Sequence, residues 1–217
     1  MSGKILGIAG RAGSGKDTIG DYLVKKYGWE KMSFASALKD ITSILFGWDR
    51  DMLAGETPEN RKLREEKDEY WSKVFNDTIT PRRMLQILGT NILRKHLGEN
   101  IWVDVLKRKL INSDKNIVIT DVRFPNEIDM IRNLGGEMVR VERGELPSWF
   151  RELEKLQTVD SIYDLDDLGQ YEKFEELFNI HESEWKWIGY DKPSKIFSNN
   201  DSFDSLYIQI DNFMKGL

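Results

Sequence analysis

The residues whose types and spacing most clearly indicate chemistry form a glycine-rich loop at positions 10–18. The loop follows the apolar run 5–9 and precedes a helical pattern, which is the setting that the phosphate-binding pattern G-x-x-x-x-G-K requires. Glycines let the main chain wrap tightly enough for several N–H groups to point at a phosphate, and the following helix adds the positive end of its dipole. The alternative is a glycine-rich turn without a ligand. The candidate phosphate contacts are Gly10, Ala12, Gly13, Ser14, Gly15, Lys16, Asp17 and Thr18.

Lys16 is the first candidate catalytic residue, because a lysine at this place can reach the outer phosphates of a nucleotide as a point charge. In the commonest form of the motif, Ser or Thr directly follows the lysine. Here Asp17 holds that position and Thr18 comes one place later. We therefore expect the Thr18 hydroxyl to contact a phosphate or Mg²⁺.

A second candidate site follows the β-branched run 116–120, which predicts a buried parallel strand. Asp121 would lie at the carboxyl end of that strand, beside the phosphate loop, where a carboxylate can hold Mg²⁺ directly or through water. Arg123 comes two residues later and could clamp a phosphoryl group. The alternatives are a turn or helix-capping aspartate and a structural ion pair.

A third candidate set lies on the helix that is expected to begin at Thr80 and Pro81, an N-cap and a first helical residue. Helical spacing predicts that Leu85, Leu88 and Ile92 face the core. Guanidinium and amide groups can bind a phosphate and a base edge. An ordinary amphipathic helix with exposed arginines is an equal alternative. The candidate substrate contacts on the other face are Arg83, Gln86, Thr90 and Arg94.

Composition limits the other classes of function. The chain has 217 residues, of which 40% are apolar, and this suits one α/β domain with an inserted segment. It has no cysteine, which excludes disulfides and thiolate chemistry, and only two histidines, which makes a histidine metal cluster a poor fit. No signal peptide or long apolar run is visible, so we expect a cytoplasmic protein that does not bind a membrane.

The net charge of −5 is unevenly distributed. Residues 145–184 carry twelve acidic and three basic side chains, a local balance of −9, so the remainder of the chain is close to +4. A positive body suits a small anionic ligand, and the absence of a basic stripe argues against nucleic acid as a partner. The acidic stretch 160–176 is expected to be a solvated helix face.

The expected elements alternate between strands and helices in most of the chain. We predict strands at 4–9, 31–35, 116–120, 137–142 and 195–198, with helices at 17–27, 36–46, 101–111, 126–134 and from 203 onward. This order indicates an α/β fold with a five-stranded parallel sheet. The expected core comprises 1–46, 101–143 and 193–217, with a substrate-binding insert at about 47–100 and a lid at about 144–192.

The motifs together resemble the phage-type deoxynucleoside monophosphate kinases, which belong to the P-loop nucleoside monophosphate kinases. The resemblance rests on Lys-x-Thr in the phosphate loop, Ser-Phe-Ala at 33–35, Thr-Asp-Val-Arg-Phe-Pro-Asn-Glu at 120–127, the run from Gly135-Gly136 to Arg143, and His-Glu-Ser-Glu at 181–184. Residues 47–80 and 145–180 match no family segment residue by residue, and the spacing assigns no role to 181–184.

The resemblance implies a three-layer P-loop kinase fold that transfers the γ-phosphoryl group of ATP to a deoxynucleoside 5′-monophosphate, with Mg²⁺ as a cofactor. In kinases of this architecture the end of the second strand faces the acceptor and a lid brings arginines to the transferred group. This architecture makes Ser33 and Lys39 candidate substrate contacts and Arg143 and Arg151 candidate catalytic residues. Separately, Asn199 begins a turn at the carboxyl end of the last expected strand, where an adenine could pack. A helix cap and a solvated lysine are equal alternatives for Ser33 and Lys39.

Two other functions stay open. Related loops and strand patterns occur in phosphomevalonate kinase and dephospho-CoA kinase, so a different small acceptor is one alternative. A nucleotide-dependent ATPase or switch with a protein partner is the other, although no guanine-reading Asn/Thr-Lys-x-Asp segment is present. The accepted bases, the preference for deoxyribose and the formation of a homodimer are not determined by the sequence.

Overall fold

A computed structural model describes residues 3–156 and 180–217 of the chain and divides it into two compact units. The first, which we call the sheet unit, contains residues 1–32 and 113–217. The second, the helical unit, contains residues 33–112. The expected core was drawn differently, because 33–46 and 101–112 group here with the expected insert 47–100. The functions of these segments as substrate insert and lid stay predictions.

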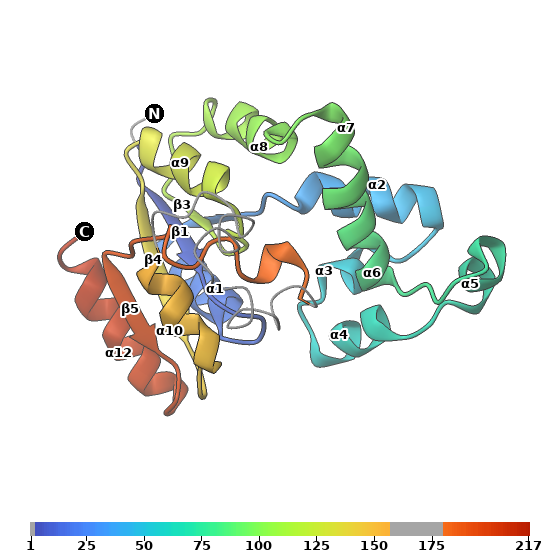
Figure 1. The fold of residues 1–217 in the computed structure, drawn as a ribbon. Coiled ribbons are helices and arrows are strands. Elements are labelled where there is room, and N and C mark those ends of the chain that lie inside the picture. The colour runs from blue at the N-terminus through green and yellow to red at the C-terminus, as the bar shows by residue number, and fades with distance from the viewer. Residues whose placement is uncertain (1–2, 157–179) are drawn as a thin grey trace. The chain divides into compact units, whose positions relative to one another are not determined.

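The sheet unit is built on a parallel sheet of five strands, as predicted (Figure 1). Its order is β2-β3-β1-β4-β5, so the first strand lies in the middle of the sheet. Each neighbouring pair is parallel, which places the carboxyl ends of all five strands at the same edge. The strands are β1 Ile5–Ala9, β2 Glu30–Met32, β3 Ile117–Ile119, β4 Glu137–Glu142 and β5 Lys195–Ser198.

The predicted bounds of the second strand were wrong. We expected residues 31–35, but β2 covers Glu30–Met32 because it pairs only with β3, and its last partner there is Ile119. Ser33 already belongs to a turn, in which its carbonyl accepts from the backbone N–H of Ser36 at 3.3 Å.

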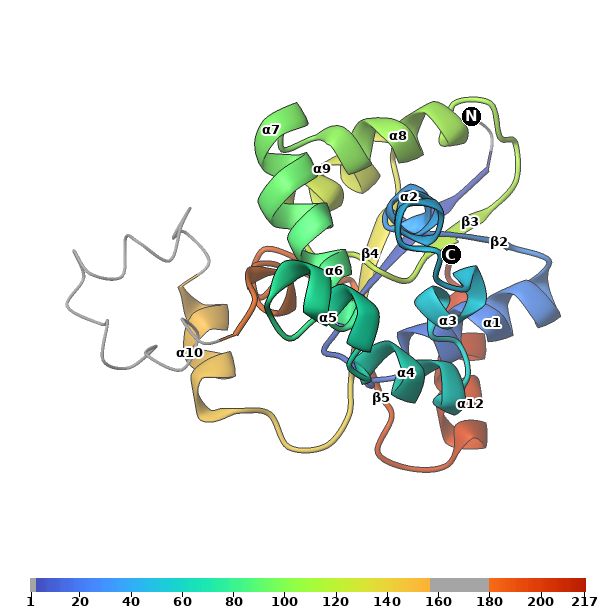
Figure 2. The same cartoon turned by 90° about the vertical axis from the view of Figure 1, so that its right-hand side faces the viewer.

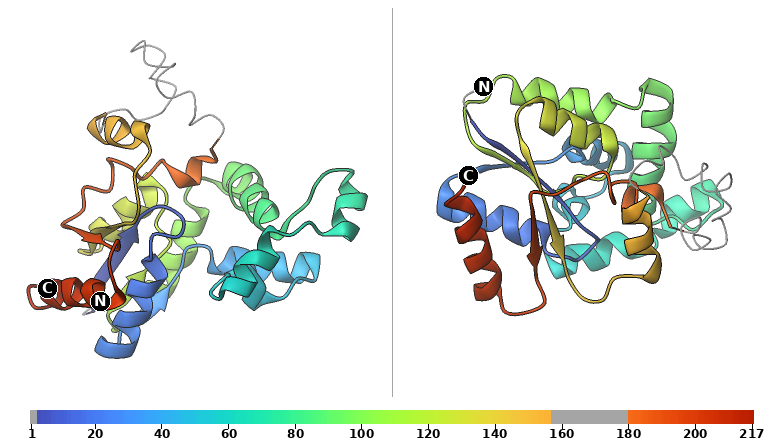
Figure 3. Two further views of the ribbon diagram at one scale, coloured as in Figure 1. Left: turned by 90° about the horizontal axis from the view of Figure 1, so that it is seen from below. Right: turned by 60° about the vertical axis from the view of Figure 1, so that its left-hand side comes forward.

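Both faces of the sheet are covered by helices, and the alternation of side chains along β1 separates them. Leu6 and Ile8 belong to a core cluster with residues of α1 (Lys16–Tyr27) and α12 (Phe203–Met214), which therefore lie on one face (Figure 3). Gly7 points the other way, where a Cβ would lie 2.6 Å from Cδ1 of Ile131 in α9 (Pro125–Asn133). This is the three-layer arrangement that the resemblance implied.

The phosphate loop connects β1 to α1, as the motif predicted. α1 begins at Lys16 and ends before Gly28, which adopts a left-handed φ of 69°. A glycine tolerates this conformation without strain, so the sequence signal for the end of the helix is confirmed.

The remaining described parts of the sheet unit flank residues 157–179. α10 covers Ser148–Lys155 and a 3₁₀ turn covers Glu182–Glu184. Residues 157–179 of the expected lid, including the whole acidic stretch 160–176, lie outside the described residues. Across the described ranges, no helix combines the length and the apolar character that a membrane span requires.

The helical unit is built of helices (Figure 2), and four of them have a side-chain cap at the N-terminus. The side chains of Asp49, Thr57, Asp68 and Thr80 each accept a hydrogen bond from a backbone N–H in the first turn of the helix that follows. The cap at Thr80 and the first helical residue Pro81 are as predicted. The helices are α2 Ser36–Phe46, α3 Arg50–Ala54, α4 Pro58–Glu65, α5 Glu69–Phe75, α6 Pro81–Gln86, α7 Lys95–Leu97 and α8 Ile101–Leu110.

Between α6 and α7 the chain forms a π-helix at Ile87–Arg94. The prediction that Ile92 faces the core is therefore wrong, because Ile92 is 42% exposed while Arg94 is 8% exposed. A π-helix makes i→i+5 hydrogen bonds and turns less per residue than an α-helix, so it rotates every later side chain away from the expected face. Leu88 is buried as predicted, and Leu85 is half-buried.

Candidate functional site

The phosphate loop is held by a hydrogen bond within it and by another from the end of β5. Within it, the Ser14 backbone N–H donates to the Arg11 carbonyl at 3.2 Å. From the end of β5, the Asn199 side-chain amide donates to the Ser14 carbonyl at 2.8 Å. Gly15 has a φ of 107°, and a Cβ there would lie 2.4 Å from that same amide nitrogen. The loop thus requires glycine at position 15 for two reasons, and Asn199 supports the loop; its contact with an adenine stays a prediction.

Lys16 is the buried cation of this loop. Its ammonium donates to the carbonyls of Gly10 at 2.7 Å and Arg11 at 2.8 Å, and the residue is 8% exposed. Burial, followed by the positive charge of Arg123, lowers the pKa of Lys16 to about 8. Nearby carboxylates act in the opposite direction; in decreasing order they are Glu184, Asp17 and Asp121. The structure therefore brings the predicted Lys16, Asp17, Asp121 and Arg123 together at the carboxyl edge of the sheet.

Asp17 links the loop to the end of β3. Its Oδ1 accepts from the Thr120 hydroxyl at 2.8 Å, and Thr120 is 5% exposed. Thr18 is half-buried in the first turn of α1. The metal contacts predicted for Thr18 and Asp121 stay predictions. The described residues contain no group of three His, Cys, Asp or Glu side chains that could hold a metal ion.

Arg123 is fixed by its main chain and by its side chain. Glu127 is 3% exposed, and its Oε2 accepts from the backbone N–H of Arg123 at 2.7 Å and of Phe124 at 3.1 Å. This carboxylate caps the first turn of α9 and so fixes the backbone position from which the Arg123 side chain extends. At the other end, the guanidinium Nη1 donates to the Ser183 carbonyl at 3.0 Å and lies 2.8 Å from Oε1 of Glu184.

The contact with Ser183 and Glu184 is the part of the site that sequence reasoning missed. The segment 181–184 was noted for its resemblance, but no spacing rule connects it with a residue sixty positions earlier. Within the segment, Nδ1 of His181 lies 2.9 Å from the Ser183 hydroxyl and accepts from the Ser183 backbone N–H at 3.3 Å. Burial lowers the pKa of His181, so its ring is held neutral as a cap for the 3₁₀ turn.

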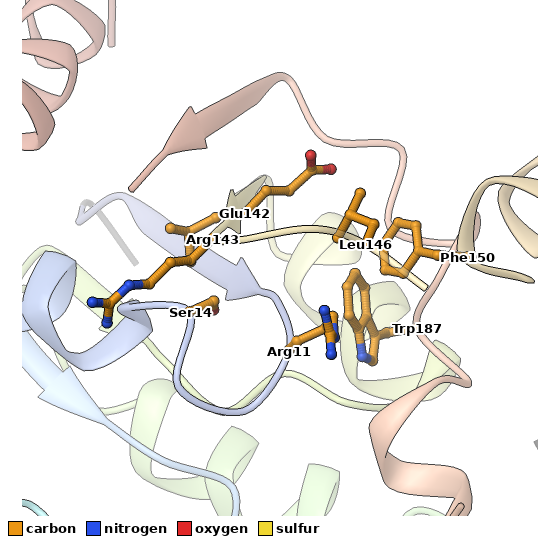
Figure 4. A pocket seen from close by; sticks show the side chains of 8 residues that line it. Arg11, Ser14, Glu142, Arg143, Leu146, Phe150 and Trp187 are labelled. Atoms are coloured by element: carbon orange, nitrogen blue, oxygen red, sulfur yellow. The ribbon is translucent and has the colours of Figure 1, made fainter. Parts of the chain in front are cut away.

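A shallow pocket lies behind the phosphate loop (Figure 4). Arg11 and Ser14 line it from the loop, and Leu146, Phe150 and Trp187 line it from the opposite side. The Ser14 hydroxyl is buried without a hydrogen-bond partner among the described residues. Arg143 also lines this pocket and is exposed, so its predicted catalytic role stays a prediction.

Arg151, the other candidate from the expected lid, is held by carboxylates. Its guanidinium lies 2.8 Å from Glu154 and 2.9 Å from Glu142, with about half of the side chain exposed. The hydrogen bond that Arg151 donates to Glu154 raises the pKa of Arg151, partial burial opposes this rise, and the negative charge of Glu142 adds to it. The geometry shows a surface ion-pair group; a catalytic contact of Arg151 stays a prediction.

Arg140, in the middle of β4, lies beside this group and is 1% exposed. Its Nε and Nη2 donate to the two oxygens of Asp191 at 2.7 and 2.6 Å, and its Nη1 contacts Glu142 and Glu154. Burial is the largest single influence and lowers the pKa of Arg140, but the hydrogen bonds and negative charges of Asp191 and Glu154 together outweigh it and raise that pKa.

The substrate candidates of the helical unit have differing surroundings. Arg83 pairs with Asp77 at 2.5 Å and donates to the Thr78 carbonyl. Arg94 donates to the Glu99 carbonyl at 3.0 Å. Half-buried positions are found for Ser33, Lys39, Gln86 and Thr90. Contacts of all six with a substrate stay predictions.

The sheet order, the glycine-rich loop between β1 and α1, and the buried lysine with an arginine at the end of β3 define a P-loop phosphotransferase. Residues 49–149 match the family model of deoxynucleotide monophosphate kinases. A protein of Acanthamoeba polyphaga mimivirus, provisionally named as a deoxynucleotide monophosphate kinase, is 32% identical over 158 residues, covering 66% of this chain and 76% of its own. The chain belongs to the deoxynucleotide monophosphate kinase family.

Two further comparisons extend over much of the chain. The deoxynucleoside-5′-monophosphate kinase of Escherichia phage T5 is 26% identical over 182 residues, covering 59% of this chain and 71% of its own. Among solved structures, a dephospho-CoA kinase from Campylobacter jejuni gives a TM-score of 0.45 at 16% identity, covering 97% of this chain and 95% of that one. A likeness at that level does not identify an acceptor.

Proposed function

We propose that the protein transfers the γ-phosphoryl group of ATP to the 5′-phosphate of deoxynucleoside monophosphates and releases ADP. The single observation that carries the proposal is the pairing of two cations at the phosphate loop, since Arg123 lies close enough to Lys16 for its positive charge to lower the pKa of the lysine. One cation can neutralise the donor phosphates while the other holds the transferred group or the acceptor phosphate. A chain of this family needs such a pair because both of its substrates are anions.

The chain's own residues supply binding, orientation and charge. The main-chain amides of the loop and the start of α1 hold the donor phosphates. Lys16 neutralises their outer oxygens, and in the structure its ammonium already lies across the loop on the carbonyls of Gly10 and Arg11. No general base is required, because an acceptor phosphate is already an anion.

Mg²⁺ is the expected cofactor, and the residues present fit it. Asp17 and Asp121 place two hard carboxylate ligands near the loop lysine, and Mg²⁺ is commonly held by one or two carboxylates together with substrate phosphates and water. The ion would neutralise the donor phosphates during transfer. Asp17 then compensates for the missing Ser or Thr after the lysine, either as a ligand itself or by orienting Thr120.

The acceptor decides the reaction. The test measures ADP formation from ATP and Mg²⁺ with each of the four common deoxynucleoside monophosphates, the matching ribonucleotides, phosphomevalonate and dephospho-CoA. We expect ADP to form only with a deoxynucleoside monophosphate. Activity with another acceptor alone would assign a different kinase, and ATP hydrolysis that no acceptor changes would assign an ATPase or switch.

The host cytoplasm as the site of action, and a homodimer as the assembled form, remain expectations. Size-exclusion chromatography with light scattering measures the second directly.

A further inference from the structure

We propose that Glu184, together with the carbonyl of Ser183, is a positioning residue that anchors one nitrogen of the Arg123 guanidinium and leaves the other edge to bind a phosphoryl group. The inference rests on the proposed function, because it assigns the orientation of an arginine within the proposed transfer site. It adds a residue from 181–184, a segment to which the sequence assigned no role.

The first argument is which atoms of Arg123 are engaged. Both side-chain contacts use Nη1, at 3.0 Å to the Ser183 carbonyl and 2.8 Å to the Glu184 carboxylate. Among the described residues, Nε and Nη2 of Arg123 have no hydrogen-bond partner. A guanidinium binds a phosphate best through two parallel N–H groups, and the edge formed by Nε and Nη2 provides them.

The second argument is that the anchor is itself fixed. His181 caps the 3₁₀ turn through the Ser183 backbone N–H, and Ser183 is 8% exposed. The indole N–H of Trp187 donates to the Glu184 carbonyl at 3.1 Å. Trp187 is 1% exposed and packs edge-on against Phe150 at 5.8 Å. The carboxylate that meets Arg123 therefore extends from a backbone held in the core, which is what a positioning residue requires.

The third argument is electrostatic. Glu184 is the first of the carboxylates that stabilise the charged form of Lys16, so it lies close to both cations of the site. It offsets part of their mutual repulsion when no nucleotide phosphate is bound. A neutral side chain at this position would leave Lys16 and Arg123 to repel each other, and the guanidinium would no longer be held in its orientation.

The experiment compares Glu184→Gln with Glu182→Gln. Glu182 is the matched control, since it belongs to the same turn but pairs with Lys186 at 2.5 Å. We expect Glu184→Gln to lower kcat by about 10- to 100-fold, because small errors in the position of a charged group cost much of its effect on transfer. The KM for the acceptor should change by less than about threefold, since the lost interaction is made mainly in the transition state. Glu182→Gln should match the wild type.

A double-mutant cycle tests whether Glu184 acts through Arg123. Arg123→Ala should lower kcat/KM, and adding Glu184→Gln to it should cause a much smaller loss than in the wild type, because the arginine that it positions is gone and only its charge interaction with Lys16 remains. A second loss of equal size would overturn the proposal. A lower acceptor KM with unchanged kcat in Glu184→Gln would also overturn it, since that result would make Glu184 a competitor for the arginine.

A readout that needs no activity separates this inference from the proposed function. The ¹⁵Nε signal of Arg123, assigned by its loss in Arg123→Ala, should shift in Glu184→Gln and stay in place in Glu182→Gln. If the wild type phosphorylates no acceptor, the proposed function fails, and the NMR comparison still decides whether Glu184 holds the guanidinium. An unchanged signal in Glu184→Gln would refute the anchor itself.

Discussion

Two arginines of the sheet unit, Arg140 and Arg123, show how differently the same side chain can be used. Arg140 is 1% exposed, and all three of its nitrogens donate to carboxylates. Its guanidinium also lies 5.6 Å from the ring centroids of both Phe150 and Trp187. Arg123 keeps 28% of its side chain exposed and uses one nitrogen.

The contrast separates a structural cation from one that is available to a ligand. Four of the five N–H groups of Arg140 donate to carboxylates, so its charge connects β4 with α10 and with Asp191, on the two sides of residues 157–179. Arg123 is oriented yet keeps donors for an anion. The number of donors already engaged is therefore a better guide to function than the presence of a positive charge at the sheet edge.

The largest expected effect is on stability, at Arg140. Arg140→Met should lower the free energy of unfolding by about 3–5 kcal/mol, because it leaves the fully buried Asp191 without a partner. Urea unfolding measures it. The double variant Arg140→Met/Asp191→Leu is the control and should recover much of the loss, since it removes both charges. Equal stability of Arg140→Met and the wild type would contradict the structural role.

Next in size is an effect on activity alone, at Lys16. Lys16→Ala should lower kcat/KM by about 100- to 1,000-fold, as expected for the loss of a major charge-stabilising group. Its thermal unfolding should stay close to that of the wild type. Lys25→Ala, an exposed lysine on the same helix, is the matched control and should retain full activity. Near-normal turnover in folded Lys16→Ala would remove the lysine from the mechanism.

The smallest expected effect is the pH dependence that Lys16 introduces. Since burial lowers the pKa of Lys16 to about 8, the free enzyme loses the ammonium above that pH, and kcat/KM for ATP should fall as the pH rises past it. The free energy of unfolding changes with pH in the opposite direction. The unfolded chain binds more protons at this lysine between about pH 8 and 10.5, so its contribution to stability rises with pH in that window. A kcat/KM profile that stays flat to pH 9.5 would contradict the assignment.

Local patterns predicted most of the sheet unit. The glycines of the loop, the apolar run before it and the Gly28 stop are adjacent in sequence, so their meaning needs no knowledge of distant residues. The bounds of β4 and β5 also match the prediction. β2 was misplaced because a strand of three residues is set by its partner strand, whose end the sequence does not display.

The rest depended on contacts between distant residues or on helix geometry. The spacing of apolar residues was interpreted with the 3.6-residue period of an α-helix, which does not reveal the π-helix at Ile87–Arg94. Ile92 was therefore assigned to the wrong face. The alternation of side chains along β4 predicts that Arg140 points away from the core. It is buried nevertheless, because a parallel strand is covered on both faces. The partner of Arg123 lies sixty residues away, and neither charge nor spacing predicts such a pair.

The hydrogen bond between Asn199 and Ser14 joins residues that are 185 positions apart. Because a chain is synthesised from its N-terminus, the glycine loop leaves the ribosome well before Asn199, and this hydrogen bond can form only after β5 has emerged. Ribosome-bound fragments that end before Asn199 would therefore have the glycine loop without this support from β5.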